Sequence, residues 1–162
     1  MQFDIVIVGA GIAGASLAWQ LAPHARVALL EMEEQPGYHA TGRSAALFME
    51  TYGTPMIRAL TCASRAFYVT PPEGFAEHPI LSPRGVMHVA KVGQEQALKD
   101  ALAFALKTSP DVELLSVSQV IERCPALRAD LLCGAVYESD AMDIDVHALH
   151  QGYLRGFRRH GG

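Results

Sequence analysis

The stretch that decides the fold lies near the N-terminus and reads Asp4-Ile-Val-Ile-Val-Gly9-Ala-Gly11-Ile-Ala-Gly14. The apolar run before Gly9 predicts a buried parallel strand, and the residues after Gly11 predict a helix over about 12–21. A second apolar run, from Arg26 to Glu31, predicts the next strand. Strand, glycine turn, helix and strand in this order are typical of a unit that binds the ADP half of a dinucleotide.

Each glycine of this stretch has its own physical reason. Gly9 permits the tight turn, Gly11 lets a pyrophosphate approach the bare backbone, and Gly14 lets the helix pack closely on the strand. The N-terminus of the helix directs unpaired N–H groups and the positive end of its dipole toward the phosphates. Glu31 ends the second strand, where its carboxylate can accept hydrogen bonds from the hydroxyls of the adenosine ribose.

Composition narrows the class of protein further. The chain has 162 residues, of which 50% are hydrophobic and 19% charged, so it can bury a core of ordinary domain size. Its net charge of −4 disfavours nucleic acid as a partner. Three cysteines without C-x-x-C spacing predict reduced thiols in a cytoplasmic protein. The uncharged run 5–22 contains three glycines and reads as strand plus helix, so we expect no integral membrane segment.

The rest of the chain predicts a mixture of helices and strands. Helices are expected over 54–69 and 94–107, from Ser118 to near Pro125, and from a cap at Asp143 or Asp145 to about Arg159. A short helix is expected to start within 42–46, and strands are expected over 81–91, 112–115 and 131–138. No further parallel strand follows Glu31, so we expect the chain to be truncated or completed by another segment.

Five further motifs carry a family resemblance: Tyr38-His-Ala-Thr-Gly-Arg-Ser-Ala-Ala46, Tyr52-Gly-Thr-Pro55, Leu81-Ser-Pro-Arg84, Asp143-Ile-Asp145 and Ala148-Leu-His-Gln-Gly-Tyr-Leu-Arg-Gly156. With the glycine turn, they resemble the FAD-dependent D-amino acid oxidase/dehydrogenase (DAO) superfamily, and within it the bacterial D-arginine dehydrogenases. The resemblance extends over essentially the whole chain. It implies an α/β fold in which a Rossmann-like FAD-binding domain of the GR2/DAO type is followed by the start of an antiparallel α+β substrate domain.

The resemblance also implies domain bounds and roles. Residues 1–78 and 145–162 would form a discontinuous, incomplete FAD-binding domain, and 79–144 would begin the substrate domain. Tyr52 would orient the carboxylate or amine of the substrate, and no residue is expected to bind a metal. The expected FAD contacts are Gly9, Gly11, Ile12, Ala13, Gly14, Glu31, Met32, Arg43, Ser44, Ala45 and Ala46.

The implied reaction oxidises the Cα–N bond of a D-amino acid by hydride transfer to the flavin. The imino acid that results would hydrolyse to a 2-oxo acid and ammonia, and the resemblance does not define the electron acceptor. One departure concerns the side chain of the substrate. D-Arginine dehydrogenases carry a carboxylate where this chain has Val86, and a polar residue where it has Leu47. An unpaired buried guanidinium costs about 3–5 kcal/mol, so we expect a neutral or apolar D-amino acid.

Several alternatives remain open at this stage. Glycine and sarcosine oxidases and 2-hydroxyacid dehydrogenases belong to the same superfamily. Glu31 suits NAD as well as FAD, although the motif at 42–46 favours FAD. A non-catalytic alternative is a truncated nucleotide-binding fragment, and the 162-residue chain alone is expected to be inactive.

His147 and His150 lie three apart and could share a metal, but helix capping by an aspartate explains this segment more simply. His39 lies in the flavin-side loop and could approach the cofactor.

Overall fold

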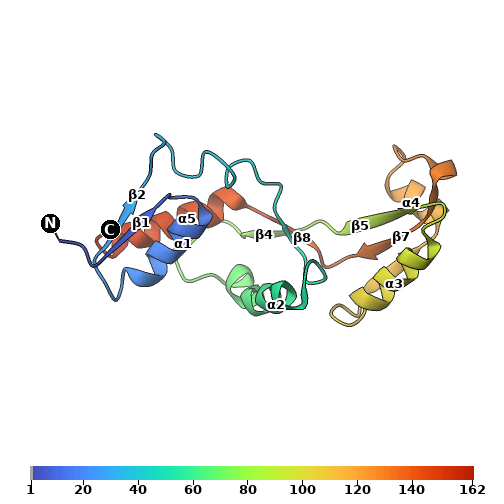
Figure 1. Cartoon of the computed structure of the whole chain (residues 1–162), viewed down its shortest axis with the longest axis horizontal. Coiled ribbons are helices and arrows are strands. Elements are labelled where there is room, and N and C mark those ends of the chain that lie inside the picture. Colours follow the sequence, from blue (N-terminus) through green and yellow to red (C-terminus); the bar gives the residue numbers. More distant parts are fainter. Residues whose placement is uncertain (1) are drawn as a thin grey trace. The chain divides into compact units, whose positions relative to one another are not determined.

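The computed structural model describes residues 2–162, which divide into two compact units (Figure 1). The first unit contains the chain up to Ala46, residues 65–82 and residues 144–162. The second unit contains residues 47–64 and 83–143. Residues 47–64 therefore group with the second unit rather than with the glycine turn. The domain bounds expected from the sequence stay a prediction.

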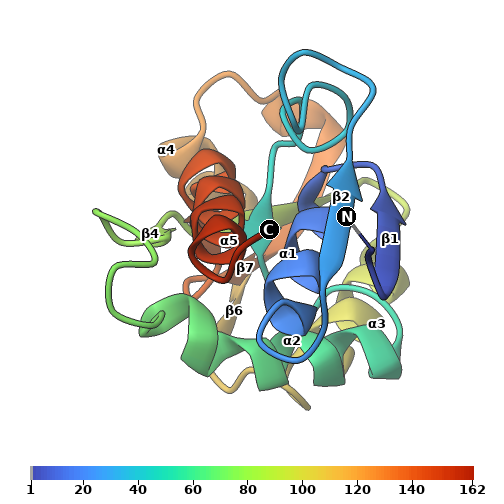
Figure 2. The same ribbon diagram turned by 90° about the vertical axis from the view of Figure 1, so that its left-hand side faces the viewer.

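The first unit is built on the predicted strand–helix–strand. β1 (Ile5–Val8) pairs in parallel with β2 (Val27–Leu30), and α1 (Ile12–Leu21) connects them. α1 lies between this pair of strands and α5 (Val146–Arg159) (Figure 2). The core between them contains Ile7, Ala18, Val27 and Phe157. The small side chain of Ala18 is fully buried, which lets the backbones of the layers approach.

Two glycines on one face of α5 make room for aromatic rings that pack against this helix, one of them from α1. A Cβ placed on Gly156 would lie 2.4 Å from two atoms of the Trp19 ring, and one on Gly152 would lie 2.4 Å from Phe75. Trp19, Phe75 and Tyr153 form an aromatic cluster with ring centroids 5.1–5.6 Å apart. Positions 152 and 156 of α5, which lie against Phe75 and Trp19, therefore leave no room for a side chain.

The second unit contains an antiparallel sheet in the order β5-β7-β6, formed by β5 (Val86–Lys91), β7 (Leu132–Glu138) and β6 (Val112–Leu115). α3 (Glu95–Ala105) covers one face of the sheet through Leu98 and Ala105. α4 (Val117–Arg123) covers the other face through Val120. The register places Val86, His88 and Ala90 on one face and Met87 and Val89 on the other, as the alternation in the sequence predicts.

The remaining elements are short apart from α2 (Pro55–Val69). β3 (Leu47–Phe48) pairs antiparallel with β8 (Met142–Ile144), and the chain also forms β4 (Leu81–Pro83) and a 3₁₀ turn over Ala129–Leu131. The sequence analysis predicted neither β3 nor β8. A strand of two or three residues is too short to show a period, so its partner across the sheet determines it.

Two predicted elements differ from the structure. The short helix expected to start within 42–46 is wrong, because the chain forms successive turns there, in which the Gly42 N–H donates to Gly37 O at 2.7 Å. The single strand expected over 81–91 is interrupted at Arg84 and Gly85. Both of their N–H groups donate to the Ala141 carbonyl, and Gly85 has a φ of +71°, so the strand pattern is broken between β4 and β5.

The caps of two helices are also defined. Of the two predicted caps for α5, Asp143 and Asp145, the structure has Asp145, whose carboxylate accepts the Ala148 N–H at 2.8 Å. α4 is capped by Ser116 rather than by Ser118, and the side chain of Gln119 completes the capping box.

Two general features complete the description. Across residues 2–162, none of the helices has the length and apolar character needed to cross a lipid bilayer. Cys62, Cys124 and Cys133 form no disulfide bond.

Candidate cofactor-binding site

The glycine turn at the carboxyl end of β1 is shaped by close backbone contact. The Gly9 N–H donates to Leu30 O at 2.7 Å, and Gly9 has a φ of +93°. A Cβ placed on Gly14 would lie 1.9 Å from the Gly9 carbonyl oxygen, a separation that no side chain tolerates. The structure therefore confirms that Gly14 lets α1 approach the strand. No atom lies within 4 Å of a Cβ placed on Gly9, so the outer side of the turn is open.

Ala10, at the centre of the turn, is held from two directions. Its N–H donates to Glu31 Oε2 at 2.9 Å, and its carbonyl oxygen lies 2.7 Å from His150 Nε2. Ala10 and His150 are 2% and 3% exposed, so the hydrogen bond between them is shielded from water. Glu31, directly after β2, and His150 of α5 thus hold the two successive peptide groups on either side of the Ala10 Cα.

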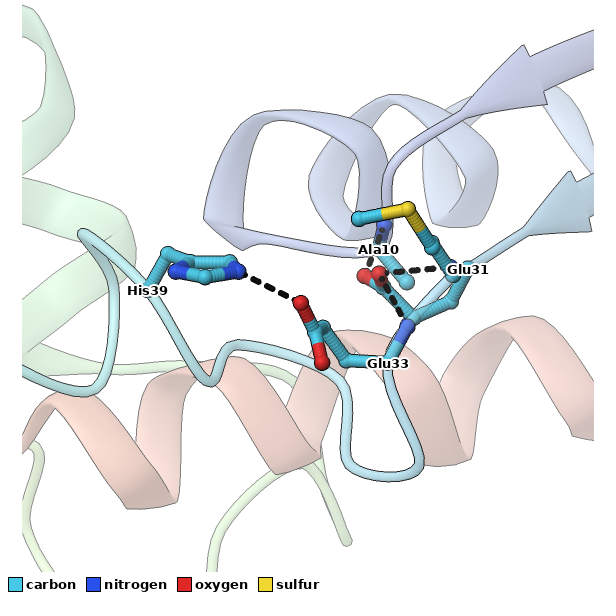
Figure 3. Close-up of polar contacts among 5 residues, drawn as sticks. Ala10, Glu31, Glu33 and His39 are labelled. Atoms are coloured by element: carbon cyan, nitrogen blue, oxygen red, sulfur yellow. Dashed lines mark hydrogen bonds and ion pairs between the residues drawn. The ribbon is translucent and has the colours of Figure 1, made fainter.

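Glu31 lies at the predicted end of β2 and its carboxylate faces the turn (Figure 3). Oε1 accepts the N–H groups of Met32 and Glu33 at 2.8 and 3.1 Å, while Oε2 accepts that of Ala10. These backbone hydrogen bonds, that from Glu33 first, lower the pKa of the Glu31 carboxyl. A carboxylate offers about four acceptor positions, so Oε2 keeps one for a ribose hydroxyl.

The N-terminus of α1 receives one hydrogen bond from outside the helix. The Ile12 N–H donates to Thr41 Oγ1 at 2.9 Å. Within residues 2–162, the N–H groups of Gly11, Ala13 and Gly14 have no hydrogen-bond acceptor. Three unpaired N–H groups at one helix end suit an anion. The sequence analysis did not single out Thr41. Its hydroxyl, in a loop expected to line the cofactor, could have indicated a contact with the helix N-terminus.

The loop that carries Thr41 also bounds a hollow of about 700 Å³ against the start of α5. Its walls include Tyr38, Thr41, Ser44, His147 and His150. The other residues expected to contact FAD in this loop are Arg43, Ala45 and Ala46, and the Arg43 guanidinium lies 5.1 Å from the centroid of the Tyr38 ring. Met32, two residues after the end of β2, is 88% exposed.

His39 pairs with a neighbouring carboxylate: its Nε2 lies 2.7 Å from Glu33 Oε1 (Figure 3). His147 is exposed, whereas His150 is buried with Nε2 engaged by Ala10, so the two histidines do not act as a pair. In the part of the chain that the structure describes, no group of three His, Cys, Asp or Glu side chains could hold a metal ion.

Tyr52 belongs to the second unit, where it borders a cavity of about 190 Å³. The walls of this cavity include Thr51, His88, Phe104, Val136 and Glu138. Glu138 is 3% exposed, and its carboxylate accepts a hydrogen bond from the Thr51 hydroxyl. Among residues 2–162, no Lys, Arg or His side chain lies within 4 Å of this carboxylate. The sequence analysis did not identify Glu138.

Register explains what Glu138 adds to the cavity. Val86 of β5 and Glu138 of β7 are direct partners across the sheet, so their side chains lie on the same face. Glu138 therefore places a carboxylate on the face of the sheet that carries the Val86 side chain. Because the two residues are far apart in the sequence, only the pairing of the strands reveals this relation.

Comparison with known proteins identifies the family of this chain. Residues 4–162 match the family of FAD dependent oxidoreductases named DAO, and the chain belongs to that family. An L-2-hydroxyglutarate dehydrogenase of Escherichia coli (strain K12) is 43% identical over 76 residues, which cover 41% of this chain and 18% of that protein. An L-aspartate oxidase of Yersinia pestis is 45% identical over 51 residues, which cover 30% of this chain and 10% of that protein.

Solved structures share the fold of this chain. The crystal structure of glycine oxidase from Geobacillus kaustophilus superposes with a TM-score of 0.81 at 24% identity, covering 98% of this chain and 45% of the other. At this identity the likeness shows the fold alone. The chain spans less than half the length of the relatives and structures that it matches.

The family's cofactor is FAD, and the first unit fits it on structural grounds. The close contact between α1 and the Gly9 carbonyl leaves the turn open on its outer side, and the N–H groups of Gly11, Ala13 and Gly14 are unpaired. Glu31 Oε2 keeps one acceptor position beside the turn. These groups match a diphosphate and a ribose in their chemistry and in their order along the site.

Proposed function

We propose that this chain is part of an enzyme that oxidises the Cα–N bond of a D-amino acid to an imino acid, which water converts to a 2-oxo acid and ammonia. The observation that carries the proposal is the cavity beside Tyr52, which combines a phenol, an apolar wall and the buried Glu138 carboxylate. An amino acid presents the matching groups, namely an α-amine, an α-carboxylate and a side chain. The family resemblance of the segment 52–55 supports the same assignment.

The cofactor supplies the redox chemistry, since bound FAD accepts a hydride equivalent from the substrate carbon. The protein residues then have binding roles. Gly11, Ala13 and Gly14 would donate N–H groups to the pyrophosphate, and Glu31 would accept from the ribose. We assign Arg43, Ser44, Ala45 and Ala46 to the phosphate–ribityl and ring region, and Met32 to the adenine.

Tyr52 is the residue that we assign to the substrate. Its side chain is 67% exposed and borders the cavity, so its phenol is accessible to a ligand. The phenol can donate a hydrogen bond to the substrate carboxylate or accept one from the amine. An essential protein base is not required when the substrate arrives with an uncharged amine.

Glu138 changes the expectation for the substrate side chain. The preference for a neutral or apolar side chain rested on the absence of a carboxylate at Val86, and the register supplies one at Glu138. A buried carboxylate with no cationic side chain within 4 Å would be stabilised by a cationic ligand. We therefore propose a D-amino acid with a cationic side chain, whose charge contacts Glu138 while its methylene groups contact Val136 and Phe104.

A second candidate reaction is the oxidation of a 2-hydroxy acid. The similarity to an L-2-hydroxyglutarate dehydrogenase over 76 residues favours it. A dicarboxylic substrate would place a negative charge close to Glu138, which is unfavourable. The two candidates therefore predict opposite responses to removal of the Glu138 charge.

The test uses the longer FAD-loaded protein that contains this chain, with D-arginine, D-methionine, D-phenylalanine and L-2-hydroxyglutarate as substrates. Anaerobic bleaching of the flavin absorbance reports reduction, and turnover with an artificial electron acceptor gives kcat/KM. We expect bleaching with D-amino acids and the highest kcat/KM with D-arginine. Glu138→Gln should lower kcat/KM for D-arginine about tenfold or more and leave D-methionine unchanged. Asp140→Asn, at an exposed acid two residues away, is the matched control. Bleaching by the hydroxy acid alone would overturn the proposal.

A further inference from the structure

We propose that His150 is a positioning residue for the pyrophosphate-binding turn: its hydrogen bond to the Ala10 carbonyl aims the Gly11 N–H at the cofactor. The ring of His150 is 3% exposed and its Nε2 lies 2.7 Å from the Ala10 oxygen. A carbonyl oxygen only accepts hydrogen bonds, so Nε2 carries the proton and donates it.

Peptide planarity connects this hydrogen bond to the site. The Ala10 carbonyl and the Gly11 N–H belong to one trans peptide group, so they point in opposite directions. Because the carbonyl points toward α5, the N–H points away from α5. No acceptor for this N–H is found among residues 2–162. His150 therefore fixes the direction of a donor that is available to a phosphate.

The turn needs such a constraint because of its composition. Ala10 stands between Gly9 and Gly11, and glycine has access to more backbone conformations than any other residue. Glu31 holds the N–H of Ala10, which orients the preceding peptide group. His150 holds the carbonyl, which orients the following one. With both contacts in place the turn is ordered before the cofactor binds, so binding loses less conformational entropy.

The position of the His150 ring is itself determined by the loop before Thr41. A Cβ placed on Gly37 would lie 2.9 Å from His150 Cε1, so the backbone at Gly37 packs directly on the ring. Gly37 has a φ of +83°, which favours glycine independently. The imidazole is thus held between this loop and the glycine turn, and it links two segments that are both expected to contact FAD.

Two substitutions separate the hydrogen bond from packing. His150→Gln places an amide N–H donor three bonds from Cβ, the same number as Nε2 of histidine. His150→Asn places its donor only two bonds away, too short to reach Ala10. The readouts are the FAD dissociation constant, from quenching of flavin fluorescence, and the melting temperature without FAD. His78→Asn, the same chemical change at an exposed position of the first unit, is the control.

We expect His150→Gln to bind FAD within about threefold of the wild-type chain, and His150→Asn to bind about tenfold more weakly. Both should lose a similar amount of thermal stability, because both remove the ring. The proposal is overturned if the two variants weaken FAD binding equally, if neither changes it, or if the wild-type chain binds no FAD. Failure of D-amino acids to reduce the flavin would refute the proposed substrate and leave this inference intact.

Discussion

Substitution of Gly14 by alanine tests the geometry on which the cofactor site depends. The added Cβ would lie 1.9 Å from Gly9 O, 3.1 Å from Gly9 C and 3.4 Å from Ile7 Cγ2. Real Cβ contacts are almost never shorter than 3.0 Å, so α1 and the turn must separate by about 1.1 Å. Neither neighbour at the closest contact is a flexible side chain, because both atoms belong to the backbone of Gly9.

The cost follows from what this separation disrupts. Ala18 is fully buried on the same helix and packs with Ile7 and Val27 of the strands, so displacement of α1 opens these contacts. Overpacking a core position costs 1–3 kcal/mol in typical cases, and a clash with backbone belongs at the upper end, so we expect about 3 kcal/mol. A domain has only about 5–15 kcal/mol of unfolding free energy, so this loss is large.

Gly9→Ala is the matched control, since it makes the same chemical change in the same turn. No atom lies within 4 Å of the new Cβ, and only the φ of +93° opposes it, at a cost of about 1–2 kcal/mol. Urea unfolding followed by the fluorescence of Trp19, the single tryptophan, reports on α1 directly. If Gly14→Ala unfolds at the same urea concentration as Gly9→Ala or the wild type, the close-approach argument is wrong.

Three further substitutions probe the contacts around α1. Thr41→Val removes the acceptor for the Ile12 N–H and should lower the unfolding free energy by about 1 kcal/mol in urea titrations, as loss of a cap does. The pKa of the Glu31 carboxyl is lowered from its ordinary value of 4.5, so its hydrogen bonds contribute fully to the stability of the fold at a pH above 4.5. This contribution is lost as the pH falls through the lowered pKa. Glu31→Gln should therefore flatten this acid limb of a stability–pH curve, and an unchanged limb would contradict the assignment. Gly156→Ala places a Cβ 2.4 Å from Trp19 and should shift the tryptophan emission together with the urea midpoint.

The strand–helix–strand unit was predictable because all its information is local. An apolar run of strand length, a glycine at each required position and an acid after the next run specify β1, α1, β2 and Glu31 without reference to distant residues. The structure confirms these elements, the parallel pairing of the strands and the close approach at Gly14. The FAD requirement follows from the family to which the chain belongs.

Contacts between residues far apart in the chain decided the rest. His150 reaches Ala10 across 140 positions, and Glu138 faces Val86 only because β7 pairs with β5 in one register. Shifting that register by one residue would turn Glu138 to the opposite face of the sheet. Local patterns determine which elements form and where a turn must be glycine, because these depend on neighbouring residues. Which side chains share a site depends on how the elements pack, and packing energy is a property of the folded chain as a whole.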